Sequence, residues 1–280
     1  MVLLMLKRTV LGGAPPRRQK TACPRDGVGK SATPRLPLDS APFYRDSPAM
    51  PDAVYVRDAF SRIADRYVLT NHVLSCGADI WWRRAVAARI RHWHPARVLD
   101  VASGTGDLAL EIQRQYPDCE VIAADFCAEM LAHAATRGVA KTLVADALNL
   151  PFPDGWFDVV TVAFGLRNMA DYPAALREMH RVLKPGGRLL ILDFSLPNGL
   201  LRRPYRFYLH HVLPRMAGWL TGQRDAYEYL GGSIEAFPSG TAMTGLLETC
   251  GFTQASATPL TGGVVAIYQG SRPHPAPFPQ

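Results

Sequence analysis

The chain has 280 residues, of which 48% are hydrophobic and 20% are charged, as in ordinary globular proteins. Its formal net charge is +7, but residues 1–49 hold nine Lys or Arg and three Asp, so the remainder carries only +1. This distribution excludes a nucleic-acid footprint on the folded part, and no run of about 18 apolar residues predicts a transmembrane helix. Five cysteines without paired or metal-ligand spacing favour a reducing cytosol.

Residues 1–49 are rich in Pro, Arg, Ser and Gly and lack the periodicity of a helix or a strand, which predicts disorder. A transit peptide, a genuine tail and a start site placed too far upstream are three explanations for this basic segment. We favour the third, with Met50 as the initiator, because organised sequence begins directly after it. We therefore expect a disordered extension over 1–49 and a single folded domain over 50–280.

Beyond Met50, short apolar runs alternate with longer helical segments. Helices over 55–93 are expected to lead into the first strand. The predicted strands are 97–102, 120–125, 141–146, 157–164 and 188–195, and the predicted helices between them are 107–116, 128–136 and 174–183. This rhythm predicts an α/β fold in which a doubly wound, mostly parallel sheet has helices on both faces.

The C-terminal part departs from this rhythm in two ways. The β-like runs GFTQASATP (251–259) and GVVAIYQGS (263–271) predict an antiparallel hairpin that closes one edge of the sheet. Residues 198–240 contain too many aromatic rings for a solvated loop, so we expect a helical cap over the open end of the sheet. The rings and imidazoles of this segment are Tyr205, Phe207, Tyr208, His210, His211, Trp219, Tyr227, Tyr229 and Phe237.

The first strand ends in a glycine-containing loop, VLDVASGTGD, that has the features of a nucleotide-binding turn. Gly104 and Gly106 allow close backbone approach to a ligand, and the following helix offers free N–H groups. Asp125, at the end of the second strand, can accept hydrogen bonds from both ribose hydroxyls. The stretch GTGDLA also fits the dinucleotide pattern, with Ala109 in its last position, so the loop alone leaves two cofactors open.

Two further features of the sequence favour S-adenosylmethionine over a dinucleotide. Asp100 and Asp107 flank the loop and would serve an anionic pyrophosphate poorly, whereas a sulfonium with an amino group tolerates them. Asp146 can accept a hydrogen bond from an adenine amino group, and the apolar LNLPF that follows can sandwich the ring. The candidates for binding the cofactor are Asp100, Gly104, Thr105, Gly106, Asp125, Asp146, Ala147 and Ala163.

Several stretches resemble one family, the UbiE/MenG quinone-biosynthesis C-methyltransferases. They are RVLKPGGRLLILDFS (181–195), FGLRN (164–168), YEYLGGSIEAFP (227–238) and VRDAFSRIADRY (56–67). The chain departs from the family pattern at Val68 and Thr70, and Asp79 stands where the family has His. Asp193 likewise replaces the usual Glu. The resemblance covers roughly residues 55–270 and implies a class I S-adenosylmethionine-dependent methyltransferase fold.

The resemblance also implies the reaction. The expected acceptor is demethylmenaquinol, which becomes menaquinol, with a benzoquinol precursor of ubiquinone as the alternative. An O- or N-methyltransferase for another small apolar acceptor, and a binding module without turnover, are further alternatives. We expect no metal, because the methyl group of the donor is already activated, and no nucleic-acid partner, because the folded part carries little net charge. We expect a cytoplasmic protein with peripheral contact to the inner face of the membrane, where a prenylated acceptor resides, and a homodimer is a further expectation.

Transfer of a methyl group to a ring carbon needs a phenolate, so something must accept a proton and stabilise the oxyanion. Arg167 and Asn168 follow the fourth predicted strand, which in this fold ends beside the methyl donor. Because a guanidinium stays protonated, Arg167 is expected to stabilise the phenolate and to order a water that accepts the proton. Asn168 can hold the second ring oxygen or cap the next helix, and Tyr67 is a candidate partner on the acceptor side.

Other roles remain open for these residues. Arg167 could instead form a structural ion pair with Asp193 or Asp171. His180, His210 and His211 are alternative bases, although His180 lies within a predicted helix and is more typical of a core or surface position.

Overall fold

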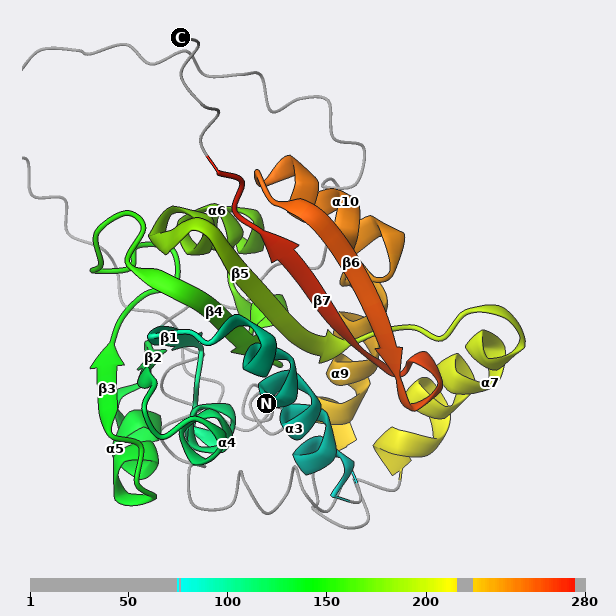
Figure 1. The fold of residues 1–280 in the computed structure, drawn as a ribbon. Coiled ribbons are helices and arrows are strands. Elements are labelled where there is room, and N and C mark those ends of the chain that lie inside the picture. Colours follow the sequence, from blue (N-terminus) through cyan, green and yellow to red (C-terminus); the bar gives the residue numbers. More distant parts are fainter. Residues whose placement is uncertain (1–74, 76, 216–223, 275–280) are drawn as a thin grey trace, which may run out of the picture. The chain divides into compact units, whose positions relative to one another are not determined.

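The computed structural model describes residues 75, 77–215 and 224–274. The extension expected over 1–49, the helices expected over 55–74 and the candidate Tyr67 lie outside the described residues. The described part contains a seven-stranded sheet and the helices that pack on it (Figure 1).

The strands lie in the order β3-β2-β1-β4-β5-β7-β6. Their bounds are β1 (Arg97–Val101), β2 (Glu120–Asp125), β3 (Lys141–Val144), β4 (Phe157–Ala163), β5 (Leu183–Phe194), β6 (Thr253–Leu260) and β7 (Val265–Ser271). Strands β1 to β5 pair in parallel, whereas β7 runs antiparallel to both β5 and β6. The predicted doubly wound sheet with its closing hairpin is therefore confirmed.

The strands β5 and β3 differ from their predicted bounds for local reasons. β5 begins five residues before the expected Arg188, because Leu183 pairs with Phe157 ahead of an irregularity in the ladder between β4 and β5. β3 ends at Val144, and Asp146 instead forms an isolated antiparallel bridge with Asn149.

Helices cover both faces of the sheet, as expected (Figure 1). One face packs against α3 (Ala78–Ile90), α4 (Asp107–Gln115) and α5 (Ala128–Thr136), and the other against α6 (Tyr172–Val182) and α10 (Thr241–Thr249). Consecutive residues of a strand point to opposite faces, so Val159 belongs to the first core and Val160 to the second. The sheet thus separates two hydrophobic cores, both fully buried.

The described part of 198–240 is helical. It comprises a short turn η5 (Gly199–Leu201), α7 (Arg202–Phe207), the π-helical η6 (Tyr208–Val212) and α9 (Arg224–Ala236). Leu209, Leu213, Leu230 and Ile234 form a small core of their own within this segment. None of the helices in the described ranges is long and apolar enough to cross a membrane.

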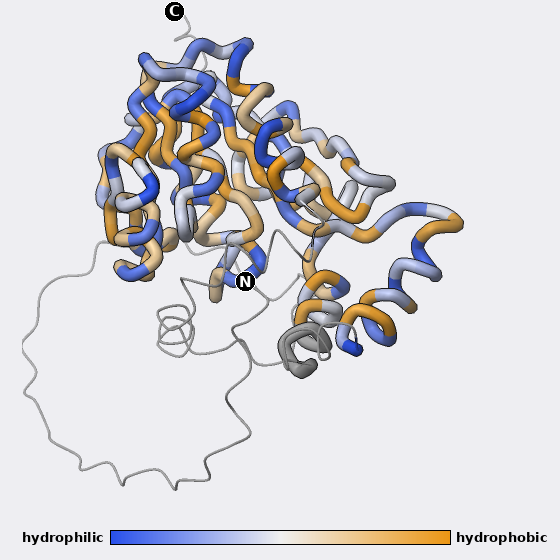
Figure 2. Tube along the Cα trace, turned by 90° about the horizontal axis from the view of Figure 1, so that it is seen from below, coloured by the Kyte–Doolittle hydropathy of each residue, from blue (hydrophilic) through white to orange (hydrophobic). Residues whose placement is uncertain are grey.

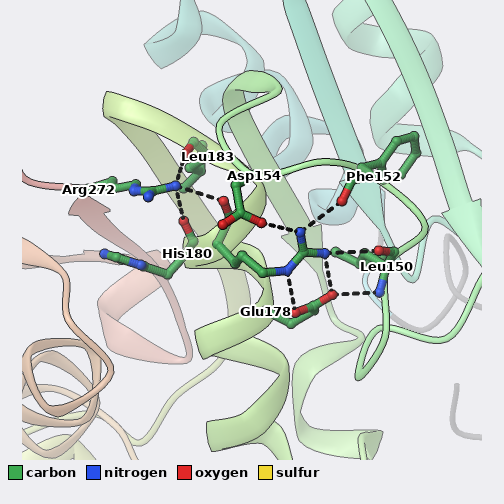
Figure 3. Close-up of polar contacts among 8 residues, drawn as sticks. Leu150, Phe152, Asp154, Glu178, His180, Leu183 and Arg272 are labelled. Carbon is green, nitrogen blue, oxygen red and sulfur yellow. Dashed lines mark hydrogen bonds and ion pairs between the residues drawn. The ribbon is translucent and has the colours of Figure 1, made fainter.

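Two arginines form networks of hydrogen bonds and ion pairs near the start of β4 and β5 (Figure 3). Arg272, directly after β7, donates to the carbonyl oxygens of His180, Arg181 and Leu183 at 3.3, 2.7 and 2.5 Å. Arg181 forms ion pairs with Glu178 and Asp154 and donates to loop carbonyl oxygens before β4. These contacts connect the end of α6 to the residue after β7 and to the loop before β4.

Candidate active site

A cavity of about 380 Å³ lies at the carboxyl ends of β1 and β4. The chain winds outward from β1 through β2 and β3 and then continues from β4 on the other side. These two strands therefore form the switch point at which open α/β sheets bind ligands. The loop after β1, the helix α3, the end of β4 and the segment of α7, η6 and α9 all contribute side chains to the lining.

The loop between β1 and α4 depends on glycine. Gly104 and Gly106 have φ angles of 58° and 78°, in the region that favours glycine. A Cβ atom on Gly106 would lie 2.5 Å from Val139 Cγ2 and 3.0 Å from the Cβ atom of Ala134, so any side chain there would clash with them. Asp125 holds the loop in place by accepting hydrogen bonds from the backbone N–H groups of Gly104 at 2.8 Å and Cys127 at 2.9 Å.

Asp100 brings a buried carboxylate to the cavity. Only 1% of the residue is exposed, and its two oxygens accept hydrogen bonds from the hydroxyls of Ser103 at 2.6 Å and Thr161 at 2.7 Å. Burial raises the pKa of Asp100 to about 6, although these hydroxyls and the nearby Arg83 lower it in part. A cationic ligand in the cavity would favour the ionised form.

Arg83 of α3 is a second buried charge in the lining. Its Nη1 atom lies 2.5 Å from Asp79 Oδ2, one helical turn earlier, and its Nη2 atom lies 3.9 Å from Asp107 Oδ2. Asp79 also accepts a hydrogen bond from the Ser75 hydroxyl at 2.7 Å. The acid at the position where the family has His therefore anchors a guanidinium beside the glycine loop.

Arg167 also lines the cavity and forms a buried ion pair with Asp193 of β5. Its guanidinium carbon is 4.8 Å from the centre of the Phe194 ring. Asp193 also accepts a hydrogen bond from the N–H of Phe194 at 2.8 Å, while its Oδ2 atom has no hydrogen-bond partner. Burial raises the pKa of the Asp193 carboxyl above its ordinary value, and the positive charge of Arg167 opposes this shift.

The backbone is strained at both strand ends that meet in the cavity. Ala102 after β1 and Phe164 after β4 have φ angles of 51° and 58°, which non-glycine residues rarely adopt. A Cβ atom on Gly165 would lie 2.6 Å from the Cβ atom of Ala102, so this glycine lets the two strand ends approach closely. Such strain is typical of positions held for function.

The residues predicted from the sequence fall into two groups. Those that line the cavity are Asp100, Gly104, Thr105, Ala163 and Arg167. Those outside its lining are Gly106, Asp125, Asp146, Ala147 and Asn168. Asp146 is exposed at the carboxyl end of β3, where its carboxylate accepts a hydrogen bond from the N–H of Leu148 at 2.9 Å.

The alternatives raised from the sequence also have definite positions. Arg167 is indeed paired with Asp193, and the cap of α6 is Asp171, which accepts from the N–H of Ala174 at 2.8 Å, rather than Asn168. His180 packs edge-on against the Phe252 ring, with centroids 5.0 Å apart. None of the three candidate histidines lines the cavity, and His210 instead lies 3.2 Å from Glu235.

No motif in the sequence pointed to Arg83, whereas Tyr205 and Tyr208, which line the cavity from α7 and η6, belong to the aromatic segment expected to form a cap. The two tyrosine rings are stacked, with centroids 6.4 Å apart, and burial raises the pKa of Tyr205 above its usual range. The aromatic content of 198–240 was the available signal for the tyrosines. Within the described ranges, no group of three His, Cys, Asp or Glu side chains is placed to hold a metal ion.

Comparison with curated proteins finds relatives over most of the chain. The demethylmenaquinone methyltransferase of Thermus thermophilus is 48% identical over 220 residues, which are 76% of this chain and all of that protein. The demethylmenaquinone methyltransferase of Deinococcus radiodurans is 44% identical over 223 residues, which are 78% of this chain and 92% of that protein.

Solved structures share the fold at low identity. A SAM-dependent methyltransferase of Thermotoga maritima, described as a possible histamine N-methyltransferase, has a TM-score of 0.54 at 19% identity and covers 76% of this chain and 97% of its own. Human N-acetylserotonin methyltransferase has a TM-score of 0.53 at 18% identity, and the match covers 78% of this chain and 56% of that protein. These likenesses confirm the predicted class I fold.

The sequence profile of the ubiE/COQ5 methyltransferases matches residues 50–272. This match confirms the resemblance seen in the sequence motifs and the expectation of S-adenosylmethionine as the methyl donor. The chain belongs to the ubiE/COQ5 methyltransferase family.

Proposed function

We propose that the protein transfers the methyl group of S-adenosylmethionine to a ring carbon of demethylmenaquinol and so forms menaquinol. The observation that carries this proposal is the 48% identity to a demethylmenaquinone methyltransferase along the whole length of that relative. The cavity supports it, because acidic groups lie near the glycine loop and aromatic rings lie toward α7. We assign the activity to a domain over 50–280.

The residues around the glycine loop fit the methyl donor. We propose that Asp100 receives its ammonium group and Arg83 its carboxylate, since these opposite charges lie together in the lining. Asp125 would accept from the ribose hydroxyls in addition to its backbone donors. Phe126 and Leu148, both part-exposed apolar side chains, follow Asp125 and Asp146 closely and suit an adenine ring. Thr105, Ala147 and Ala163 would complete this site.

The bound donor supplies a methyl group already activated by a sulfonium, so the protein must prepare the acceptor. Arg167 is proposed to stabilise the phenolate, with Asp193 fixing its position, and to order a water that accepts the phenolic proton. Asn168 and Tyr67 are proposed to hold the acceptor ring. In-line placement of carbon, methyl and sulfur supplies much of the rate.

The acceptor carries a prenyl chain, which needs an apolar path. Phe194, Tyr205, Leu209, Leu213 and Ile234 give one part of the lining this character. We therefore propose that the segment 198–240 covers the acceptor and that the protein works in the cytoplasm at the membrane surface. The proposal includes a homodimer but assigns no surface to it.

Incubation of the purified protein with S-adenosylmethionine and demethylmenaquinol, followed by mass spectrometry, tests the proposal. The expected product is menaquinol, one methylene group heavier than the acceptor. Quinone profiles of a strain without the gene should show accumulated demethylmenaquinone. Methylation of a benzoquinol precursor alone, or an unchanged profile, would contradict the assignment.

A further inference from the structure

The segment from η5 into α7 carries apolar side chains that contact little of the protein. Leu200 is 96% exposed, Leu201 is 57% exposed and Phe207 is 59% exposed. In Figure 1 the segment stands away from the sheet, and in Figure 2 hydrophobic and hydrophilic residues follow one another along it. We call Leu200, Leu201, Arg202, Arg203, Arg206 and Phe207 the α7 tip.

The α7 tip is also strongly basic. Arg202, Arg203 and Arg206 are exposed, and the sequence from Leu196 to Arg215 contains no Asp or Glu. Arg206 pairs with Glu235 of α9 at 2.5 Å, whereas Arg202 and Arg203 form no ion pair within the described residues. Exposed leucines next to unneutralised arginines are typical of segments that enter the interface of an anionic bilayer.

The same segment reaches the cavity. Tyr205, Tyr208, Leu209 and Leu213 line the cavity, while Arg202, Arg206 and Phe207 lie between or before them and remain in solvent. Within residues 200–213, some side chains therefore line the cavity and others are exposed to solvent. A chain that leaves the cavity along this stretch would emerge beside the exposed leucines.

We propose that the α7 tip docks on an anionic phospholipid bilayer, with its leucines and Phe207 in the interface and its arginines on the lipid phosphates. This inference rests on the proposed function, because a prenylated acceptor resides in the bilayer. A second copy of the chain fits the tip less well, since two tips placed face to face would bring like charges together. The bilayer satisfies both the apolar and the basic side chains.

Co-sedimentation with vesicles of equal parts phosphatidylglycerol and phosphatidylcholine tests the proposal. The full chain is expected to bind these vesicles and to bind pure phosphatidylcholine far more weakly. The double variant Arg202→Gln/Arg203→Gln should weaken binding on the order of tenfold or more, and Leu200→Ser/Leu201→Ser by a similar factor. Arg91→Gln/Arg114→Gln, which removes the same charge from exposed residues elsewhere, should bind as the unchanged protein does.

Equal vesicle binding by all of these proteins would overturn the proposal. So would a tip variant that keeps vesicle binding but converts a dimer to a monomer in analytical ultracentrifugation. Circular dichroism and the affinity for S-adenosylhomocysteine should be the same in every variant, which shows that each is folded. Vesicle binding is measured without acceptor, so a failure here is separate from failure to methylate demethylmenaquinol in detergent.

Discussion

A buried guanidinium needs a counter-charge, and Asp193 provides one for Arg167. The structural ion pair considered from the sequence is present, yet Arg167 also lines the cavity. These two observations are compatible, because a cation held in place by its partner needs little reorganisation when negative charge develops beside it. The pairing therefore supports the proposed role of Arg167 in stabilising a phenolate.

Replacement of Arg167 by Lys should separate this role from donor binding. We expect kcat to fall about 100-fold, because a point charge on a flexible stem does not reproduce a planar fork held by Asp193. Affinity for S-adenosylhomocysteine, measured by calorimetry, should stay close to that of the unchanged protein. Arg181→Lys is the matched control at an arginine outside the cavity, and a kcat near normal for Arg167→Lys would exclude the proposed role.

Arg83→Gln tests the proposed contact with the donor's carboxylate. Loss of a charged hydrogen bond of about 1.5–3 kcal/mol should weaken S-adenosylhomocysteine roughly 10- to 100-fold. Methylthioadenosine lacks the amino-acid part, so its affinity should hardly change. Calorimetry with both ligands makes the comparison, and Arg84→Gln is the control. Equal losses for the two ligands would show that Arg83 supports the fold of the site instead.

The same pair of arginines shows where prediction from the sequence ends. Arg83 and Arg84 are consecutive, and the sequence gives only Asp79, four residues before Arg83, as a local difference between them. In the structure the Arg83 side chain is 11% exposed and the Arg84 side chain 59%. The difference in exposure arises from the packing of α3 on α4 and on the glycine loop, which buries Arg83 and brings Asp107 of α4 to it. By contrast, Asp100 and Gly104 follow a predicted strand, and that connection alone places them at the carboxyl edge.

At the scale of elements, periodicity predicted most of the fold. Runs such as 97–102 and 157–164 are mostly apolar on both faces, as in strands covered on both sides, and their buried polar residues Asp100 and Thr161 bond to one another. The order β5-β7-β6 also follows from a hairpin that adds to the sheet by its second strand. The start of β5 was not predictable, because LKPGG has the residues of a turn and becomes extended only by pairing with Phe157 across an irregular ladder.

Arg272 joins two elements that are distant in the sequence, and its removal should cost stability without affecting the chemistry. Arg272→Ala is expected to lower the free energy of unfolding by about 1–3 kcal/mol, because three carbonyl oxygens near the end of α6 lose a charged donor. Urea unfolding measures this loss, and Arg272→Lys should recover part of it. The kcat of folded protein should not change, since neither Arg272 nor the residues to which it donates line the cavity. An unchanged unfolding midpoint would contradict the expectation.

For the molecule as a whole, the candidate site is a source of instability that the two cores must offset. Two left-handed residues, a buried ion pair and the buried carboxylate of Asp100 lie within one cavity. Each is unfavourable for folding taken alone, whereas burial of the apolar side chains in the two hydrophobic cores is favourable. Relief of one such feature should therefore stabilise the protein and impair ligand binding together.

The substitution Asp100→Asn tests whether stability rises while ligand binding weakens. The pKa of Asp100 is raised from 3.8 to about 6 in the folded protein. Its contribution to stability is therefore full below about pH 4 and is lost as the pH rises through about 6. Asn does not ionise, so the variant should exceed the unchanged protein in stability at about pH 8, by an amount on the order of 3 kcal/mol, and differ little at about pH 4.

Urea unfolding at the two pH values measures that difference, and Asp118→Asn at an exposed residue controls for the loss of one charge. Calorimetry with S-adenosylhomocysteine should show weaker binding by Asp100→Asn, because the donor's ammonium group loses its carboxylate. For the unchanged protein, the same affinity should decline as the pH falls through about 6. The stability of the variant is compared with that of the unchanged protein at each pH. If the difference between them is the same at about pH 8 as at about pH 4, burial of the ionised carboxylate does not destabilise the fold. Stabilisation with unchanged ligand affinity would instead remove Asp100 from the donor site.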